Sequence, residues 1–314
     1  MRVGLLSTAA INGALLGGAR ASDAAEVVAV ASRDAGRARA YADEHGIPAA
    51  YGSYEELLAA GDVDAVYVSL PNSLHVPWAI RALEAGKHVL CEKPLSRHPD
   101  DVERAFDAAE RAGRVLMEAF MWRYTPQAQR LQELLPRVGR LRIVRAAFSF
   151  SDREPGDVRL SRELEGGALM DVGCYCLSAI RLVGGEPVSF GAAQVLGGEG
   201  VDVLFTGALG LADDAVAHFD CGMTTVRRDD LEVAGTDGSL FLDDPWHSRE
   251  PVIELRAPDG SLQERIECEP VNPYACELRE LAAVAAGERE PRFGRADAVA
   301  QATAIARCYE AAGA

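Results

Sequence analysis

The chain opens with the stretch Val3-Gly4-Leu5-Leu6-Ser7-Thr8-Ala9-Ala10-Ile11-Asn12-Gly13. An apolar run, a turn of small side chains and an Ala/Leu-rich continuation predict a strand, a tight turn and a helix. Such a turn presents backbone N–H groups and a helix N-terminus, which together can bind a pyrophosphate. A dinucleotide-binding turn reads Gly-x-Gly-x-x-Gly, whereas Ser7, Ala9 and Asn12 stand at the three glycine positions here. We therefore expect a phosphate-binding loop with a weakened glycine pattern.

Short apolar strands continue to alternate with helices as far as residue 120. Strands are expected at 27–31, 64–70, 88–91 and 115–119, and helices at 35–45, 54–60, 77–85 and 101–112. This alternation predicts a parallel sheet that is covered on both faces by helices joined through right-handed crossovers.

The rhythm changes after Phe120. Helices are expected at 127–135, 168–182, 275–286 and 295–312, and a long strand at 141–150. Beyond Pro187, apolar runs are separated by turns that include Asp237-Gly238 and Asp259-Gly260, and Asp-Gly between apolar runs indicates antiparallel hairpins. We predict an α/β chain of two domains, residues 1–120 around the parallel sheet and residues 121–314 around a mostly antiparallel sheet.

Charge and composition exclude several classes of function. The chain has 32 Lys and Arg against 48 Asp and Glu, a formal charge of -16 that repels phosphate backbones and anionic lipids, so we expect neither a nucleic-acid nor a membrane partner. No apolar run approaches the roughly 20 residues of a membrane-spanning helix. The seven cysteines are scattered without a Cys-x-x-Cys pair, so we expect reduced thiols, no metal site and a cytoplasmic protein.

The first residues also loosely imitate a secretory signal. Met1-Arg2 precede an apolar stretch, and Ala19-Arg20-Ala21 imitates a cleavage site. Asn12 interrupts the apolar stretch, and cleavage would remove the expected strand and phosphate loop. We therefore interpret this segment as part of the fold.

The end of the second expected strand indicates which dinucleotide is bound. An acidic residue at this place would accept hydrogen bonds from the ribose 2′-OH of NAD and would repel a 2′-phosphate. Here Ala31 is followed by Ser32 and Arg33, a hydroxyl donor and a bidentate phosphate donor. The sequence favours NADP, with NAD left possible.

Two further segments carry chemistry. His88-Val89-Leu90-Cys91-Glu92-Lys93-Pro94 puts Lys93 at the carboxyl end of a parallel strand, the edge at which open α/β sheets bind ligands. A partly desolvated lysine has a lowered pKa and can exchange a proton with a hydroxyl. Asp171 and Tyr175 lie four residues apart at the start of a helix, and this spacing puts them on one face. A lysine, a carboxylate and a phenol form a proton-handling set.

With these segments the chain resembles the Gfo/Idh/MocA family of NAD(P)-dependent oxidoreductases, in its sugar dehydrogenase and dihydrodiol dehydrogenase branch. The segments that carry the resemblance are Pro71-Asn72-Ser73-Leu74-His75, Ala82 to Val89, Glu92-Lys93-Pro94, Gly166 to Tyr175, Gly235 to Ser239 and Asn272-Pro273-Tyr274. The resemblance extends over nearly the whole chain, from Val3 to the final helix.

The resemblance implies a Rossmann domain, then an α/β domain whose large open sheet mediates a homo-oligomer, a dimer or tetramer, and an active site between the domains. It implies Lys93 as the catalytic lysine, Asp171 as its partner, and Tyr175 at a position where many members carry histidine. The cofactor-binding residues are expected to be Ser7, Thr8, Ala9, Ile11, Ser32, Arg33, Leu70, Pro71, Asn72, His75, Glu92 and Lys93. The substrate-binding residues are expected to be Arg123, Tyr124, Asp171, Tyr175 and Tyr274, with His75 as a further candidate.

The expected function is hydride transfer between NADP and a sugar or related polyol, either as an aldose C1 dehydrogenase or as a keto- or anhydro-sugar reductase. Tyr175 would exchange the hydroxyl proton and Lys93 would stabilise the charge that develops. Two alternatives stay open at this stage. One is a trans-dihydrodiol or other alcohol dehydrogenase, and the other is a cofactor-binding regulator with the same fold and no chemistry.

Overall fold

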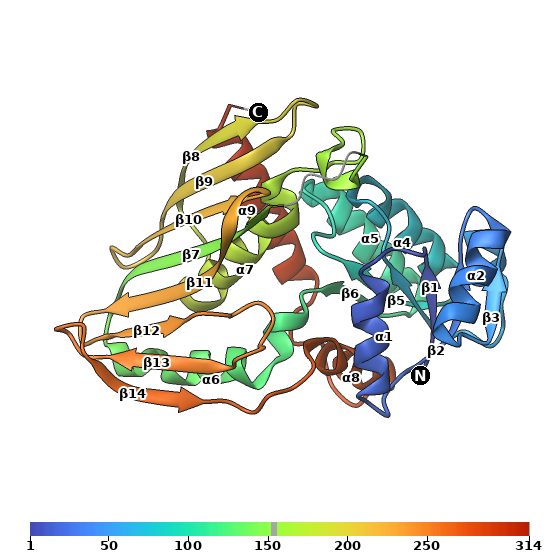
Figure 1. Ribbon diagram of the computed structural model, residues 1–314, viewed down its shortest axis with the longest axis horizontal. Coiled ribbons are helices and arrows are strands. Elements are labelled where there is room, and N and C mark those ends of the chain that lie inside the picture. The colour runs from blue at the N-terminus through green and yellow to red at the C-terminus, as the bar shows by residue number, and fades with distance from the viewer. Residues whose placement is uncertain (152–155, 314) are drawn as a thin grey trace. The chain divides into compact units, whose positions relative to one another are not determined.

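The computed structural model describes residues 1–151 and 156–313 and divides into two compact units (Figure 1). The first unit contains Met1–Met121 and Asn272–Val299, and the second contains the described residues of Trp122–Val271 and Ala300–Ala314. Helix α8 (Pro273–Ala285) therefore belongs to the first unit, because it packs on α1 (Asn12–Arg20) rather than on the elements that precede it in the chain. The division falls within α9 (Arg295–Ala311). A single boundary at residue 120 stays a prediction.

Within the described residues, the first unit is built on a parallel six-stranded sheet with the order β3-β2-β1-β4-β5-β6. The strands are β1 (Arg2–Leu6), β2 (Glu26–Ala31), β3 (Ala49–Tyr51), β4 (Ala65–Val68), β5 (His88–Glu92) and β6 (Leu116–Ala119). The further helices are α2 (Ala35–His45), α3 (Tyr54–Ala59), α4 (His75–Glu84) and α5 (Pro99–Ala112). Strand order reverses between β1 and β4, which defines a topological switch point at their carboxyl ends.

Local sequence explains where these elements begin and end. The Asp34 carboxylate accepts the backbone N–H of Arg37 and caps α2, which ends at Gly46 with φ of 71°. Pro99 begins α5, where its missing N–H costs nothing. All four residues of β4 are buried, as expected for a central parallel strand. The predicted alternation is confirmed, and β3 is an additional strand that the sequence pattern did not indicate.

The described part of the second unit contains an eight-stranded sheet with the order β14-β13-β12-β11-β7-β10-β9-β8. The strands are β7 (Leu141–Ser151), β8 (Ser189–Leu196), β9 (Asp202–Gly210), β10 (Val216–Gly222), β11 (Thr224–Gly235), β12 (Ser239–Leu242), β13 (Val252–Arg256) and β14 (Leu262–Glu267). All of its pairs are antiparallel except β7 with β10. Both predicted Asp-Gly hairpins are present, at the β11–β12 and β13–β14 turns. The expected mostly antiparallel sheet is confirmed.

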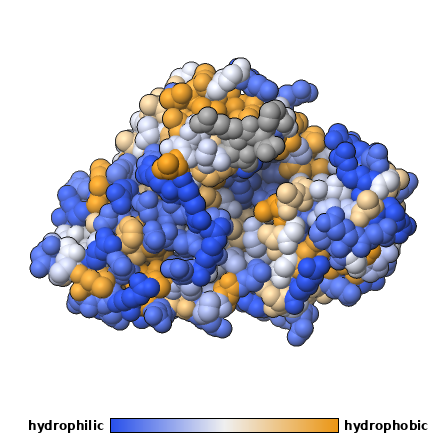
Figure 2. Space-filling model, in the orientation of Figure 1, coloured by the Kyte–Doolittle hydropathy of each residue, from blue (hydrophilic) through white to orange (hydrophobic). Residues whose placement is uncertain are grey.

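One face of this sheet packs against α7 (Cys174–Gly184), and α6 (Pro126–Leu134) contacts β13. Alternating side chains of the strands point to this face. On β7 Val144 and Ala146 are buried and Arg145 between them is exposed, and on β11 Leu231 and Val233 are buried and Glu232 between them is half-buried. The surface seen over β12 to β14 is mainly hydrophilic (Figure 2). Among the residues that the structure describes, no helix has the length and apolar character needed to span a membrane.

Candidate active site

The carboxyl ends of β1 and β4 are joined by a network of buried polar side chains. The Ser7 and Ser69 hydroxyl oxygens lie 2.8 Å apart, and Ser69 also donates to the Asn12 amide oxygen at 2.7 Å. Asn12 donates in turn to the Ser7 carbonyl at 2.8 Å. The three residues form the strand-end network, which holds the loop after β1 against the loop after β4.

The strand-end network explains how the loop folds without its glycines. Ser7 has φ of 150°, a conformation that favours glycine, and its hydroxyl accepts the Ala9 N–H at 3.0 Å. Asn12 is fully buried at the first position of α1. Thr8, Ala9 and Ile11 are half-buried within the same turn, where their backbone can face a ligand. Side-chain hydrogen bonds therefore stabilise a turn that glycine usually permits by its lack of a Cβ.

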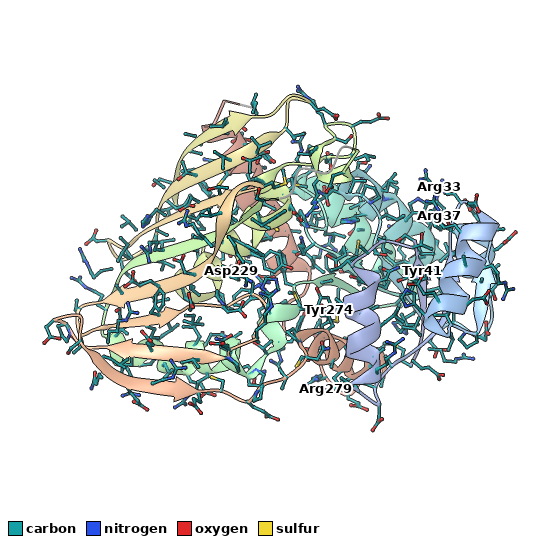
Figure 3. All side chains as sticks on the ribbon, in the orientation of Figure 1. Arg33, Arg37, Tyr41, Asp229, Tyr274 and Arg279 are labelled. Atoms are coloured by element: carbon teal, nitrogen blue, oxygen red, sulfur yellow. The ribbon has the colours of Figure 1, made fainter. Side chains whose placement is uncertain are left out.

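The end of β2 carries two arginines close to the start of α2. Arg33 precedes α2 and Arg37 lies in its first turn; both are exposed, and Figure 3 labels them close together beside α2. Ser32 is 5% exposed, and its hydroxyl accepts the Asp34 N–H at 3.3 Å. The Asp34 carboxylate is engaged by the Arg37 backbone N–H. The acidic side chain near this strand end is thus a helix cap, and the groups presented to a ligand are cationic.

The segment after β5 places Lys93 at the carboxyl edge of the sheet. The Lys93–Pro94 peptide bond is cis, and the Lys93 side chain is half-buried. Glu92 accepts a short hydrogen bond from the Tyr67 phenol of β4. His75 is 1% exposed, and its ring nitrogens lie 2.9 Å and 2.7 Å from the carbonyl oxygens of Pro94 and Leu70. The imidazole therefore ties the loop after β4 to the loop after β5.

Pro71 and Asn72 follow directly on Leu70 and are half-buried at the start of a 3₁₀ turn, Asn72–Leu74. The structure thus brings the predicted cofactor residues of β1, β4 and β5 to one edge of the parallel sheet. It gives His75 a supporting position beneath these loops, and its direct contact with a cofactor or substrate stays a prediction.

Helix α8 adds two acidic groups beside Glu92. The Asn272 side chain accepts the backbone N–H groups of Tyr274 and Ala275 and so begins the helix. Burial raises the pKa of the Tyr274 phenol, and the charges of Glu92 and Glu277 raise it further. Burial, with the Glu92 charge, raises the pKa of Glu277 well above its ordinary value, and neither carboxyl oxygen of Glu277 has a hydrogen-bond partner among the described residues. Burial at this position therefore favours the neutral form of the Glu277 carboxyl over its charged form.

In the second unit, Gly166 and Gly167 are required by close approaches of other groups. A Cβ at Gly166 would lie 2.2 Å from the Arg159 carbonyl oxygen, and one at Gly167 would lie 2.2 Å from Asp202 Oδ1. Asp202 accepts the Leu169 N–H at 2.7 Å and the Tyr309 hydroxyl at 2.8 Å. Burial raises the pKa of Asp202 to about 6, although both hydrogen bonds oppose this shift. The Gly-Gly sequence and Asp202 together fix where the following helix starts.

That helix begins with one turn of π-helix, Leu169–Gly173, before it continues as α7. Single π turns of this kind are often found at functional sites. Asp171 lies in the π turn, where its carboxylate is 3.7 Å from the Arg159 guanidinium, and Arg159 also pairs with Asp157. The prediction of one regular α-helix over 168–182 is thus modified, because the helix begins with a wider π turn that contains Asp171 and becomes α-helical only at Cys174, before Tyr175.

Tyr175 lies against a cluster of aromatic rings. Its ring centroid is 5.3 Å from that of Phe148 on β7 and 5.9 Å from that of Trp246, both in edge contact. The residue is 6% exposed. Arg123 and Tyr124 are also buried, and Arg123 donates to the Ser178 hydroxyl of α7 at 2.6 Å. The predicted substrate contacts of Arg123, Tyr124 and Tyr274 stay predictions.

Several residues of these sites were not indicated by the sequence. Ser69, Arg37, Tyr67 and Glu277 come from segments without a local signature, and Asn12 was noted only as a missing glycine. These residues are brought to their sites by tertiary packing.

A parallel sheet in this order, with polar loops at its switch point, defines a dinucleotide-binding protein, and the second unit supplies a phenol and a carboxylate suited to proton transfer. Sequence profiles agree with this class. The profile described as an oxidoreductase family with an NAD-binding Rossmann fold matches residues 3–120, and that of the Gfo/Idh/MocA C-terminal domain matches residues 129–241. The chain belongs to the Gfo/Idh/MocA oxidoreductase family.

Three known proteins show what the chain is similar to. D-xylose 1-dehydrogenase (NADP⁺) 2 of Haloferax volcanii is 40% identical over 99% of this chain and 97% of its own length. The crystal structure of a 3-ketoreductase from Actinomadura kijaniata, in complex with NADP and TDP-benzene, superposes with a TM-score of 0.91 and 32% identity over 97% of this chain and 95% of that one. Trans-1,2-dihydrobenzene-1,2-diol dehydrogenase of Xenopus tropicalis is 34% identical over 73% of this chain and 70% of its own.

Proposed function

We propose that this chain is an NADP-dependent oxidoreductase that transfers a hydride to or from the carbinol carbon of a sugar or related polyol. It would act either as an aldose C1 dehydrogenase or as a keto- or anhydro-sugar reductase. The observation that carries the proposal is the 40% identity to an NADP-dependent xylose dehydrogenase across 99% of the chain. That similarity is accompanied by Lys93 at the carboxyl end of β5 and Tyr175 at the start of α7.

The residues of the first unit fit NADP. The turn after β1 offers backbone N–H groups at the start of α1, where neither a capping side chain nor an acidic residue competes with a phosphate. Arg33 and Arg37 would hold the 2′-phosphate, and Leu70, Pro71, Asn72 and Glu92 would line the nicotinamide end. When bound, NADP supplies the hydride chemistry. NAD is the weaker alternative, because the Asp34 carboxylate that follows β2 is engaged as the cap of α2 and the residues directly after the strand are Ser32 and Arg33.

The proposed proton chemistry uses three side chains. In oxidation Tyr175 takes the proton of the substrate hydroxyl, and in reduction it returns that proton. Lys93 stabilises the phenolate and the negative charge that develops on the substrate oxygen. Asp171 orients the substrate, and the pairing of its carboxylate with Arg159 restricts its position.

A substrate panel tests the proposal. Aldoses, alditols and keto-sugars are mixed with the enzyme and NADP or NADPH, and absorbance is followed at about 340 nm, where the reduced nicotinamide absorbs. At least one should be turned over by the natural chain. Lys93→Met should bind NADP nearly as well, because the phosphate loop is intact, and should lose roughly 10²- to 10⁴-fold in turnover. Retained turnover would refute the role of Lys93. Tight NADP binding without turnover of any substrate would favour the regulator.

A second candidate function is dehydrogenation of a trans-dihydrodiol. The specific observation in its favour is the aromatic wall beside Tyr175, since Phe148 and Trp246 are suited to an apolar ring. The dihydrodiol dehydrogenase similarity points the same way but covers less of the chain. Adding trans-1,2-dihydrobenzene-1,2-diol to the panel separates the two candidates by their ratios of kcat/KM.

Assembly and location are part of the proposal. A homo-oligomer, dimer or tetramer, is supported by the large open sheet, whose face away from α7 exposes Ile143 and Val216. A cytoplasmic location is supported by seven free cysteines. The formal charge of -16 supports the absence of nucleic-acid and membrane partners. Light scattering of the purified chain would measure the oligomer directly.

A further inference from the structure

Asp229 occupies a place where the strand pattern favours an apolar side chain. It lies on β11 directly opposite Phe148 of β7, so both side chains point to the face of the sheet that packs on α7. The neighbouring residues on the same face are apolar. They are Val144 and Ala146 on β7 and Leu231 and Val233 on β11, and all four are buried. Asp229 is only 7% exposed and is marked in Figure 3. A carboxylate has therefore been placed on a hydrophobic face.

Only one oxygen of this carboxylate is satisfied within the described residues. Arg227 donates from Nε to Asp229 Oδ2 at 2.7 Å, and its Nη2 lies 2.5 Å from the same oxygen. Asp229 Oδ1 is buried and has no hydrogen-bond partner there. Buried polar atoms are almost always hydrogen-bonded, because leaving one without a partner costs the desolvation of that atom. An open acceptor of this kind is suited to a ligand that brings its own donor.

Asp244 and His247, in the loop between β12 and β13, lie beside this acceptor. One ligand atom from each of Asp229, Asp244 and His247 falls within 4.8 Å of the others. Asp244 Oδ1 lies 3.2 Å from His247 Nδ1 and accepts the His247 backbone N–H at 3.3 Å, and Asp244 Oδ2 accepts the Arg249 N–H at 2.9 Å. The Asp244 oxygens therefore hold the imidazole in place and are themselves engaged.

The aromatic cluster connects this group to Tyr175. The Phe148 ring centroid is 5.3 Å from that of Tyr175 and 5.6 Å from that of His247, and the ring stacks on Trp246 at 5.8 Å. Phe148 thus contacts both the phenol assigned to proton transfer and the histidine beside Asp229. A sugar has an apolar carbon surface and hydroxyl edges, which match an aromatic wall with a few placed acceptors.

We propose that Asp229 Oδ1 and the His247 imidazole form a hydroxyl-binding subsite for an uncharged polyol. This subsite would accept a hydroxyl of the substrate distal to the carbon that reacts at Tyr175, with Phe148 against the carbon chain. The inference rests on the proposed function and adds a specificity to it. Free aldoses and alditols carry such distal hydroxyls. A nucleoside diphosphate fits this subsite poorly, because its charged phosphate oxygens are acceptors and Asp229 Oδ1 is also an acceptor. A simple dihydrodiol does not reach the subsite with a donor, because it has no hydroxyl beyond the two at the reacting carbons.

A divalent cation is the competing occupant. Three side chains with oxygen and imidazole donors could ligate one. The arrangement favours the hydroxyl, because the Arg227 guanidinium already neutralises Asp229 and N–H groups engage both Asp244 oxygens. A cation would have to displace or lie beside this positive charge.

The experiment compares Asp229→Ala with a matched control, Asp230→Ala. Asp230 is the next residue of β11, so its side chain points to the other face of the sheet, where its strand partner is Ala147 of β7. Its Oδ1 lies 3.4 Å from Nη2 of Arg145. For the best aldose of the panel, Asp229→Ala should raise KM roughly 10- to 100-fold, as expected for loss of a hydrogen bond to a charged group, while changing kcat far less. Asp230→Ala should leave KM within about twofold of the natural chain, since its side chain lies on the face of the sheet away from Phe148 and Asp229.

Deoxy substrates identify the hydroxyl. In the natural chain, one of 2-, 3-, 4- and 6-deoxy-D-glucose should bind worse than D-glucose, and Asp229→Ala should abolish that difference. The melting temperature and NADP affinity of each variant show that it is folded. An unchanged KM in Asp229→Ala, or an equal loss for glucose and all four deoxy sugars, would overturn the subsite.

Two further outcomes are distinguishable. A shift of the melting temperature by Mn²⁺ or Zn²⁺ that is present in the natural chain and lost in Asp229→Ala would overturn the subsite in favour of a cation site. Failure of the proposed function has a different result, namely an unaltered chain that binds NADP and turns over no polyol. In that case calorimetric titration with D-glucose still tests the subsite, since binding lost in Asp229→Ala supports it and binding unaffected by the change overturns it.

Discussion

Asp202 and Asp229 are buried carboxylates of the same unit with opposite hydrogen-bonding arrangements. Asp202 has a partner for each oxygen, the Leu169 N–H and the Tyr309 hydroxyl. Asp229 has Arg227 on one oxygen and, among the described residues, nothing on the other. The first arrangement secures the backbone that leads into Asp171 and Tyr175. The second leaves an acceptor available beside the Tyr175 ring cluster. A buried carboxylate with hydrogen bonds to both oxygens stabilises the surrounding structure. A buried carboxylate with one oxygen unpaired can accept a hydrogen bond from a ligand.

The strand-end network in the first unit resembles Asp202, because its polar groups are hydrogen-bonded within the protein. Ser7, Asn12 and Ser69 satisfy one another, and the network replaces the conformational freedom of missing glycines with hydrogen bonds. Changes at the satisfied groups should therefore reduce stability first. Changes near the half-satisfied group should reduce activity first.

The largest effect should come from Tyr175→Phe. The phenyl ring keeps its edge contacts with Phe148 and Trp246, so the melting temperature should stay close to that of the natural chain. Loss of the hydroxyl removes the proposed proton carrier and should lower kcat roughly 10²- to 10⁴-fold. Steady-state kinetics with the best substrate of the panel measures this. An active Tyr175→Phe enzyme would show that the proton is carried elsewhere.

The next effect concerns stability against pH at Asp202. Burial raises its folded-state pKa from 3.8 to about 6, so the folded chain holds this proton more tightly than the unfolded chain between these values. Stability from this group is therefore highest below pH 4, falls as pH rises through 6, and is about 3 kcal/mol lower above that window. Asp202→Asn removes the titration, while its amide can still accept from Leu169 and donate to Tyr309.

Urea unfolding at about pH 4 and about pH 7.5 measures the difference between the two chains. The free energy of unfolding of Asp202→Asn, relative to the natural chain, should rise by about 3 kcal/mol between these conditions. A difference that does not change with pH would mean that the Asp202 carboxylate is not held in the way described, and the contrast with Asp229 would lose its basis.

A smaller loss is expected from Asn12→Ala in the strand-end network. The change removes the donor to the buried Ser7 carbonyl and the acceptor of the Ser69 hydroxyl, which should cost about 1–3 kcal/mol of stability. NADP affinity should also fall, because the turn after β1 loses its support. Gly13→Ala is a suitable control, since Gly13 lies in α1 and no atom outside that helix's own backbone and the chain neighbours lies within 4 Å of a Cβ at that position. Equal stabilities of Asn12→Ala and the control would contradict the role of the network.

The smallest effect should be seen at the exposed arginines after β2. Arg33→Ala should weaken NADP binding about tenfold and leave NAD binding nearly unchanged, since an exposed charge-assisted contact contributes on the order of 1 kcal/mol. Arg37→Ala should act in the same direction. Fluorescence titration with both cofactors measures the ratio of affinities. A parallel loss of NADP and NAD would place these side chains away from the 2′-phosphate.

Much of the first unit could be predicted, because its strands and helices have strong local patterns. The predicted helix over 35–45 matches α2 at both ends, since Asp34 caps it and Gly46 terminates it. The hairpin turns at Asp237-Gly238 and Asp259-Gly260 were equally local signals. The π turn at Asp171 could not be predicted, because it depends on close packing around Gly173, where a Cβ would lie 2.6 Å from Cys221 Sγ of β10.

The candidate site also contains residues that the sequence indicated and residues that it did not indicate. Lys93, Asp171 and Tyr175 were indicated by motifs that are contiguous in the chain, whereas Glu277 and Asp229 had no such signal. Glu277 meets Glu92 because α8 belongs to the first unit, and Asp229 meets Phe148 and His247 through strand pairing and a loop. A sequence pattern reports neighbours within about one turn of helix or one strand, and these groups are brought together over far longer separations.

The amino-acid sequence by itself determined the alternation of elements, the family, the net charge, and the segments that carry the lysine and the tyrosine. These properties depend on residue type and short-range spacing, which a linear chain displays directly. Tertiary structure alone decided which buried polar groups are satisfied and which are left open. That distinction depends on the atoms surrounding each oxygen, and only folding determines those atoms.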